Sequence, residues 1–318
     1  MRRAGYAVAA GACAAGAARL AYSAMSRRPP GGPKAWSRTN HRGEPVTLLE
    51  GPAVAAGALA GVLAQAGLAS RAQAGLVPAS GSPGASGPAG WRRAAAMVLG
   101  GTGAAAFGAY DDLAGSGDRR GFRGHLGALR QGEVTTGAVK LGGIGVTGVV
   151  SAALAGGSPA DVILNAALVA GGANLLNLFD LRPGRAIKVA AASGVLLGAA
   201  GQDSVAAPLG AALALLPEDL GERAMLGDAG ANALGAMLGA SAAGLSRPAR
   251  IALLAGIAGL TAASEKVSFT KVIARTPVLN WLDMLGRRPA SQTEPSGTEP
   301  SSPQPPVTIP AQRPESGG

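Results

Sequence analysis

Three short acidic motifs in this chain combine residue types that could perform chemistry, and each lies just past an apolar run. Carboxylates and amides are costly inside a bilayer, so their recurrence at the ends of apolar segments indicates a metal, a phosphate or an ion pathway. They can act together only if the fold brings them to one place. The motifs are Asp111-Asp112, Asn174-Leu-Leu-Asn177-Leu-Phe-Asp180 and Gly227-Asp228-Ala229-Gly230.

The adjacent carboxylates of Asp111 and Asp112 could hold a hydrated Mg²⁺, because this ion binds a few carboxylates together with substrate phosphates. The alternative is a solvated helix end in which one carboxylate caps the following turn. Asp228 also has two interpretations, since Gly227 and Gly230 could serve only to let helices pack closely. Neither motif decides between chemistry and structure by itself.

The middle motif carries more information, because Asn174, Asn177 and Asp180 are spaced three residues apart and would line one face of a helix. Amides can bind a base or a sugar hydroxyl. The cations that follow could bind phosphate oxygens, and they are Arg182, Arg185 and Lys188. The alternative is a polar seam between helices, followed by the basic residues that commonly anchor a membrane protein on its cytoplasmic side.

The composition around these motifs is that of an integral membrane protein. Hydrophobic residues make up 47% of the chain and charged residues only 14%, and a helix needs about 20 apolar residues to cross the hydrocarbon core. We therefore predict an all-α fold, a polytopic transmembrane bundle of about nine helices. The apolar runs lie near residues 4–25, 51–70, 91–109, 138–157, 159–178, 186–201, 204–217, 224–245 and 249–264.

The bundle is expected to occupy residues 1–288. The first run is interpreted as a retained helix, because many spans follow it and no polar cleavage region separates it from them. Residues 289–318 are rich in Pro, Ser, Gln and Glu and lack apolar periodicity. This stretch is therefore predicted to be a disordered cytoplasmic tail.

The distribution of Lys and Arg between the runs predicts the orientation in the plasma membrane. Cations gather after the first run and after the third, and the alternate loops hold fewer. This pattern places the N-terminus outside and all three acidic motifs on the cytoplasmic side. The cations are Arg27, Arg28, Lys34, Arg38 and Arg42 in the first group and Arg119, Arg120, Arg123, Arg130 and Lys140 in the second.

Several classes of function are excluded by residue usage. The single cysteine, Cys13, cannot form an internal disulfide, and the two histidines, His41 and His125, form no zinc-binding cluster. The net charge of +10 follows from cytoplasmic basic loops and favours anionic membrane lipids as partners. No nucleic-acid partner is expected, because no basic stripe is interleaved with stacking aromatic residues.

The order of the motifs, Asp-Asp, then Asn-x-x-Asn-Leu-x-Asp, then Gly-Asp-x-Gly, each at the cytoplasmic end of a predicted helix, resembles the polyprenyl-phosphate N-acetylhexosamine-1-phosphate transferases. This family includes the phospho-MurNAc-pentapeptide translocase of peptidoglycan synthesis and the GlcNAc-1-phosphate transferases of teichoic-acid and O-antigen synthesis. The segment from Gly121 through Gln131 to Lys140 is also similar to the loop that follows the Asp pair in some members. The resemblance covers roughly residues 40–270.

The resemblance implies a Mg²⁺-dependent reaction in which polyprenyl phosphate, such as undecaprenyl phosphate, attacks the β-phosphorus of a UDP-N-acetylhexosamine and releases UMP. Asp228 would be the main metal ligand. Asp111 and Asp112 would assist catalysis by binding metal or by deprotonating the lipid phosphate. Asp112 would be the second metal ligand. Asn174, Asn177 and Asp180 would line the nucleotide-sugar pocket, with Lys140, Arg130, Arg182, Arg185 and Lys188 as phosphate contacts. A homodimer is one arrangement that the resemblance allows.

The chain departs from the family pattern at three places. Members usually continue the middle motif as Asp-Gly-x-Asp-Gly, whereas this chain has Pro183 in place of the second Asp. Ala231 stands where Gly-Asp-x-Gly is usually followed by Ser. The late loop with clustered histidines is replaced by Glu265 to Lys271, leading to Asn280-Trp281-Leu-Asp283. These differences bear on the choice of sugar and on activity.

Two other classes of function fit parts of the sequence. A catalytically reduced paralogue could bind a lipid-linked precursor and scaffold envelope assembly, which would explain the substituted motifs. A cation-coupled transporter could use the Asp residues as an ion path, but it would need carboxylates near the middle of the bilayer rather than at helix ends.

Overall fold

The structure is a computed structural model that describes residues 2–74, 88–115 and 131–289. The predicted phosphate contact Arg130 and the predicted disordered tail, from residue 290 onward, lie outside the described residues. The regular structure of the described part is helical except for one short two-stranded ribbon. The prediction of an all-α fold is therefore confirmed.

Nine long helices in the described part coincide with the nine apolar runs of the sequence. They are α1 (Arg2–Arg27), α3 (Glu50–Gln73), α4 (Pro88–Ala114), α6 (Thr136–Ala155), α7 (Pro159–Phe179), α8 (Arg185–Ala199), α9 (Ala206–Leu220), α10 (Gly227–Ala242) and α11 (Arg247–Ser264). The short elements are α2 (Pro33–Trp36), β1 (Ser37–Thr39), β2 (Pro45–Thr47), the 3₁₀ helix η1 (Asp203–Val205), α12 (Phe269–Arg275) and α13 (Pro277–Met284).

Some of these helices have the length and the apolar composition of membrane-spanning helices. Within the described ranges, three helical segments are long and apolar enough to cross a bilayer, namely Glu50–Ala72, Thr136–Ala155 and Pro159–Phe179. A fourth arises if α11 and α12 are counted as one span broken by a 95° bend. These helices are compatible with a membrane protein, whereas nine crossings and their orientation stay a prediction.

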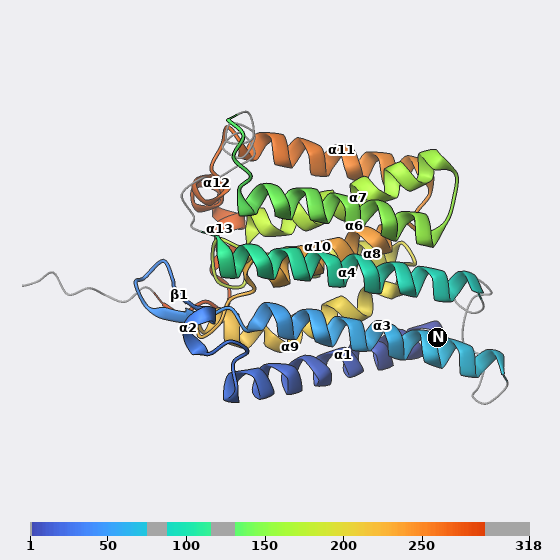
Figure 1. The fold of residues 1–318 in the computed structure, drawn as a ribbon, viewed down its shortest axis with the longest axis horizontal. Coiled ribbons are helices and arrows are strands. Elements are labelled where there is room, and N and C mark those ends of the chain that lie inside the picture. The colour runs from blue at the N-terminus through green and yellow to red at the C-terminus, as the bar shows by residue number, and fades with distance from the viewer. Residues whose placement is uncertain (1, 75–87, 116–130, 290–318) are drawn as a thin grey trace, which may run out of the picture. The chain divides into compact units, whose positions relative to one another are not determined.

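Helix α10 is the centre of the bundle, and nearly all of its residues are buried. It packs against α3, α4 and α7, which surround it in Figure 1. Small residues allow this packing: a Cβ added to Gly230 of α10 would come within 2.6 Å of the Cα of Gly51 in α3. Glycine and alanine therefore bring the backbones of these helices into close contact.

The helix directions place several termini at one end of the bundle. Helices α4 and α7 end there, and α6, α8 and α10 begin there, together with β1, α2, α12 and α13 (Figure 1). We call it the acidic end, because Asp111, Asp180 and Asp228 all lie there.

The β1–β2 ribbon supports the acidic end. Its strands are antiparallel, with Arg38 opposite Val46. Thr47 forms two backbone hydrogen bonds with the segment that leads into α10. The Thr47 N–H donates to the carbonyl of Arg223, and the Thr47 carbonyl accepts from the N–H of Met225. The ribbon therefore fixes the approach of the chain to Gly227.

Candidate functional site

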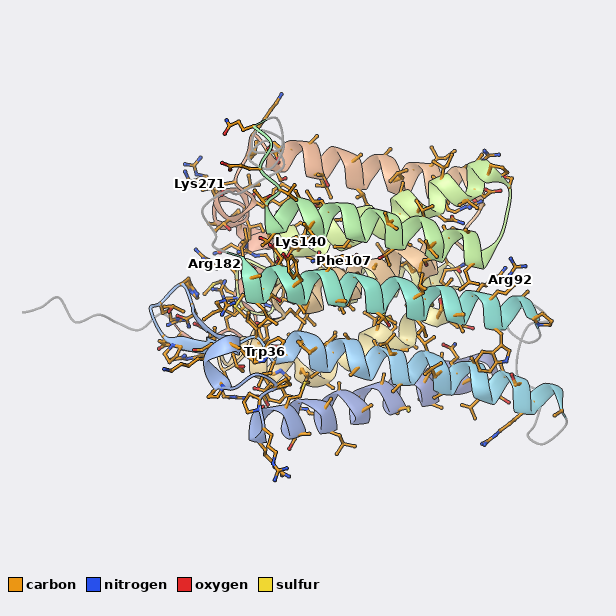
Figure 2. The ribbon with its side chains drawn as sticks, in the orientation of Figure 1. Trp36, Arg92, Phe107, Lys140, Arg182 and Lys271 are labelled. Atoms are coloured by element: carbon orange, nitrogen blue, oxygen red, sulfur yellow. The ribbon has the colours of Figure 1, made fainter. Side chains whose placement is uncertain are left out.

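Charged side chains from three helices form an ion cluster at the acidic end. The ammonium nitrogen of Lys140, in the second turn of α6, lies 2.7 Å from Asp111 Oδ2 at the end of α4 and 2.5 Å from Asp228 Oδ2 at the start of α10. All three side chains are mostly buried. Figure 2 shows Lys140 at the same end of the bundle as Arg182, and Arg92 at the other end. One cation thus joins the first and third sequence motifs.

Asp112 points to the first turn of α10 rather than to Lys140. Its two carboxylate oxygens accept hydrogen bonds from the backbone N–H groups of Asp228, at 3.0 Å, and Ala229, at 2.9 Å. The first N–H groups of a helix have no partner within the helix, and the helix dipole favours a negative charge there. Arg38 of β1 donates to the backbone carbonyl of Asp112. Asp112 therefore caps α10 from a neighbouring helix and holds Asp228 in place.

Gly227 makes this cap possible. Its φ is +59°, in the left-handed region that favours glycine, and an added Cβ would lie 3.0 Å from both Asp112 Oδ2 and Leu48 Cδ2. The glycine of the third motif is therefore required by backbone conformation and by the closeness of the Asp112 carboxylate.

Replacing Gly227 with alanine is expected to reduce the free energy of unfolding by about 1–3 kcal/mol, because a non-glycine residue would be held in a strained conformation. Thermal unfolding of the purified protein in detergent measures this loss. The matched control is Gly142→Ala in α6, where an added Cβ meets nothing within 4 Å. Equal melting temperatures for the two variants would contradict the role assigned to Gly227.

Asp180 of the middle motif lies behind the ion cluster. It is the C-cap residue of α7 and is buried. Burial raises the pKa of Asp180 well above its ordinary value, and the nearby negative charges of Asp219, Asp228 and Asp112 raise it further, whereas the backbone N–H of Gly227 acts to lower it. The pKa shift of Asp180 therefore reflects one electrostatic environment shared with the other two motifs.

The Asp180→Asn variant is expected to be more stable than the wild type, because asparagine need not bury a negative charge. The unfolded chain releases the Asp180 proton near pH 3.9, whereas the folded chain keeps it to higher pH. Wild-type stability therefore falls as pH rises through that window, and the advantage of the variant grows. The difference in melting temperature between Asp180→Asn and the wild type, measured near pH 3.9 and at neutral pH, tests this expectation. A difference that shrinks toward neutral pH would contradict it.

Two further carboxylates at this end were not singled out from the sequence. Glu50, the first residue of α3, is fully buried, and neither carboxylate oxygen has a hydrogen-bond partner among the described residues. Asp219, in the last turn of α9, is also buried, and its Oδ2 lacks such a partner. The available signal was an acidic residue beside an apolar run, single at Glu50 and part of the Glu218-Asp219 pair in α9, which is also typical of a solvated helix end.

The amides of the middle motif are placed differently from Asp180. Asn174 Nδ2 donates to Thr261 Oγ1 of α11 at 3.3 Å, so this side chain lies in a polar seam between α7 and α11. Asn177 is half-buried one turn closer to the acidic end. Asn174 therefore belongs to a polar seam between helices, the alternative that the sequence left open. Asn177 lies nearer to Asp180.

Two of the three cations after the middle motif bind α13. Arg185 is buried and forms a two-pronged ion pair with Asp283, at 2.7 and 3.0 Å, and it also donates to Thr270 Oγ1. Lys188 Nζ donates to the backbone carbonyls of Leu282 and Asp283. Arg182 is half-buried and forms no ion pair within the described part of the chain. Arg182 is therefore the one of the three without a hydrogen bond to α13 in the described part of the chain.

Removing the carboxylate of Asp283 is expected to be strongly destabilising. Asp283 also binds Arg287 Nη1 at 2.8 Å, so Asp283→Ala leaves two mostly buried guanidinium groups uncompensated, at a cost of about 3–5 kcal/mol. The control is Arg288→Ala, which breaks an exposed pair with Glu44 worth about 1 kcal/mol or less. Similar melting temperatures for both variants would show that Asp283 is not a structural anchor.

The ion cluster offers carboxylate oxygens, which are the ligands that Mg²⁺ prefers. Within the ranges that the structure describes, no three His, Cys, Asp or Glu side chains form a group that could hold a metal without other ligands. Asp111 and Asp228 nevertheless present carboxylate oxygens to one shared cation, the Lys140 ammonium. Two carboxylates suit Mg²⁺ when substrate phosphates and water complete its shell. Both oxygens of Asp112 already serve α10, so the geometry favours Asp111 as the partner of Asp228.

A cavity of about 410 Å³ lies toward the opposite end of the bundle, and none of the described motif residues line it. Its polar lining includes Gln65, Asn165, Gln202 and Arg250. The ion cluster is thus separate from this cavity and sits where helices end.

No protein-family model matches this chain, and no curated protein matches it.

Proposed function

We propose that this protein is a Mg²⁺-dependent phosphoglycosyltransferase, which transfers a sugar-1-phosphate from a UDP-N-acetylhexosamine to polyprenyl phosphate and releases UMP. The observation that carries the proposal is the shared cation. Asp111 and Asp228, from motifs far apart in sequence, converge on Lys140 at an end of the bundle where Asp180 also lies. This constellation follows the order of acidic motifs in the transferases that the sequence resembles.

The reaction forms a bond between an oxygen of the lipid phosphate and the β-phosphorus of the nucleotide sugar. The bond between that phosphorus and the oxygen bridging to the α-phosphate breaks, and UMP leaves with the electron pair. Both substrates are anions, so the site must supply positive charge and alignment. When bound, Mg²⁺ would supply charge neutralisation of the diphosphate and stabilise the leaving group.

The residues of the cluster divide these tasks. Asp228 and Asp111 would hold the metal, and Lys140 provides a cation between them that can contact a phosphate oxygen. Asp112 keeps Asp228 in place through α10. Proton removal from the lipid phosphate therefore falls to Asp111, whose oxygens do not cap a helix. Arg182 and Asn177 are the remaining candidates for contact with the nucleotide sugar.

The membrane arrangement in this proposal is a multi-pass plasma-membrane protein with nine spans, an external N-terminus and a cytoplasmic acidic end. The distribution of Lys and Arg supports it. A site at helix ends, rather than in the middle of the bundle, would meet the phosphate of a membrane-embedded lipid and a soluble nucleotide sugar at the same level. That placement also argues against an ion path through the bilayer.

A second candidate is the catalytically reduced paralogue that binds a lipid-linked precursor. Specific observations favour it: Pro183 replaces a site carboxylate, and Arg185 and Lys188 are engaged by α13. In this form the cluster would bind a lipid phosphate through Lys140 and Arg182 without turnover.

The test is UMP release by the detergent-purified protein supplied with undecaprenyl phosphate, Mg²⁺ and a panel of UDP-sugars. The transferase proposal predicts release with at least one donor, dependent on both Mg²⁺ and the lipid. Silence across the panel, from a folded protein that still binds the lipid phosphate, would overturn it in favour of the second candidate.

A further inference from the structure

The α12–α13 segment, residues 265–288, follows α11 and changes direction sharply. The axes of α11 and α12 meet at 95°, so α12 runs across the direction of α11 at the acidic end (Figure 1). A bent pair of this kind is either a broken span or a turn out of the bilayer. If α11 crosses a membrane, α12 therefore lies close to the membrane plane at the level where α11 leaves it.

Helix α13 buries a charged residue and exposes apolar ones, which is the opposite of a helix on the surface of a water-soluble protein. Its buried residue is an aspartate, Asp283, 8% exposed and paired with Arg185 and Arg287. Its apolar side chains point outward, with Val278 68% exposed, Trp281 63% and the following Leu285 55%. A helix at a protein–water surface normally buries its apolar face, and exposed apolar patches mark interaction sites. The outer face of α13 therefore requires an apolar partner.

The charges around this face indicate what the partner is. Lys266, Lys271 and Arg275 are all exposed, and Figure 2 shows Lys271 at the outer margin of this end. Within residues 265–288, the acidic side chains are Glu265 and the inward-facing Asp283. Exposed cations in the bend and on α12, followed by exposed Val, Trp and Leu side chains on and just after α13, give this segment the composition of one that lies in a membrane interface.

The segment also follows α11, which is long and apolar enough to cross a membrane only when it is counted together with α12. Helix α11 buries one residue, Ile257, and exposes Ile251 and Leu260. One apolar partner can therefore cover the exposed side chains of α11, α12 and α13, and a lipid bilayer is such a partner. The inward ion pair of Asp283 with Arg185 holds α13 against the start of α8 while its apolar side faces outward.

We infer that the α12–α13 segment is an interfacial anchor, in which Val278, Trp281 and Leu285 enter the boundary between headgroups and acyl chains. Lys266, Lys271 and Arg275 bind the headgroups of anionic lipids, each contributing through its charge near the surface. The inference concerns bulk bilayer lipid and uses none of the acidic motifs. It therefore stands or falls separately from the transferase reaction.

The test measures the depth of Trp281 in vesicles. The full chain is reconstituted in phosphatidylcholine containing lipids brominated near the carbonyl end of the acyl chain, and the emission of wild type minus Trp281→Phe isolates the signal of Trp281 from Trp36 and Trp91. Phenylalanine at this exposed position keeps the fold and an apolar side chain. We expect the isolated signal to be quenched by the brominated lipid and protected from aqueous acrylamide. A signal insensitive to the brominated lipid would overturn the anchor. Quenching by acrylamide would then indicate a face open to water, and protection from acrylamide would indicate a face covered by a protein.

The headgroup contacts are tested by replacing part of the phosphatidylcholine with phosphatidylglycerol. The wild type should show stronger quenching of Trp281 in the anionic vesicles, and a variant with Lys266, Lys271 and Arg275 all changed to serine should show the same quenching in both lipids. An equal response of wild type and variant to phosphatidylglycerol would overturn the assignment of these cations.

Discussion

The Asp228→Asn variant is expected to lose Mg²⁺-dependent UMP release by a factor of about 10²–10³ or more, because it removes a carboxylate that would hold Mg²⁺, and losing one electrostatic stabiliser of the developing charge costs on that scale. Asparagine preserves the size of the side chain. The backbone N–H of residue 228, which donates a hydrogen bond to Asp112, is unchanged. The variant therefore removes one negative charge from the cluster while α10 keeps its cap. Initial rates of UMP formation over a range of Mg²⁺ concentrations measure the effect.

The matched control for this variant is Asp203→Asn. Asp203 begins η1 and lies beside the cavity at the opposite end of the bundle, so this substitution should leave the rate unchanged. Equal rates for Asp228→Asn and the wild type would remove Asp228 from the site.

The Lys140→Met variant is expected to lose activity by a similar factor and to become more sensitive to Mg²⁺. Methionine keeps a long unbranched side chain but removes the charge that lies within 2.7 Å of both Asp111 and Asp228. Two mostly buried carboxylates are then left without their shared cation and repel each other. Mg²⁺ should replace the missing charge, so it should raise the melting temperature of the variant more than that of the wild type.

Lys140→Arg is the control for charge. It should respond to Mg²⁺ as the wild type does, even if the different shape of the guanidinium group lowers its activity. If the melting temperatures of Lys140→Met and the wild type rose equally with Mg²⁺, the metal would not bind at Asp111 and Asp228.

The helices could be predicted from the sequence because each apolar run is bounded by polar or glycine-rich segments. This was true even for α8 and α9, whose runs are short. The end of the last long helix at residue 264 was predicted, but α12 and α13 were not, because the segment from Glu265 onward was interpreted only as a cytoplasmic loop. The structure forms a bend there and then two more helical segments.

The site was predictable to the extent that it depends on helix ends. Asp111 and Asp228 were expected at the ends of helices and meet through Lys140. The engagement of Arg185 by Asp283 could not be foreseen, because the two residues are 98 positions apart and the sequence does not give the direction in which α13 packs. Asp112 was predicted as a metal ligand, yet its carboxylate faces two backbone N–H groups of α10. Backbone partners of this kind leave no signature in the sequence.

The measurement that tests the central claim most directly follows the β-phosphate of the donor. A UDP-N-acetylhexosamine with radioactive phosphorus at the β position is incubated with the purified protein, undecaprenyl phosphate and Mg²⁺, and the lipid is extracted into butanol. The account predicts label in the lipid fraction, unlabelled UMP in the aqueous fraction, and loss of both products in Asp228→Asn. Label that stays entirely in the aqueous fraction, with every donor and with wild-type protein that binds the lipid, would contradict it.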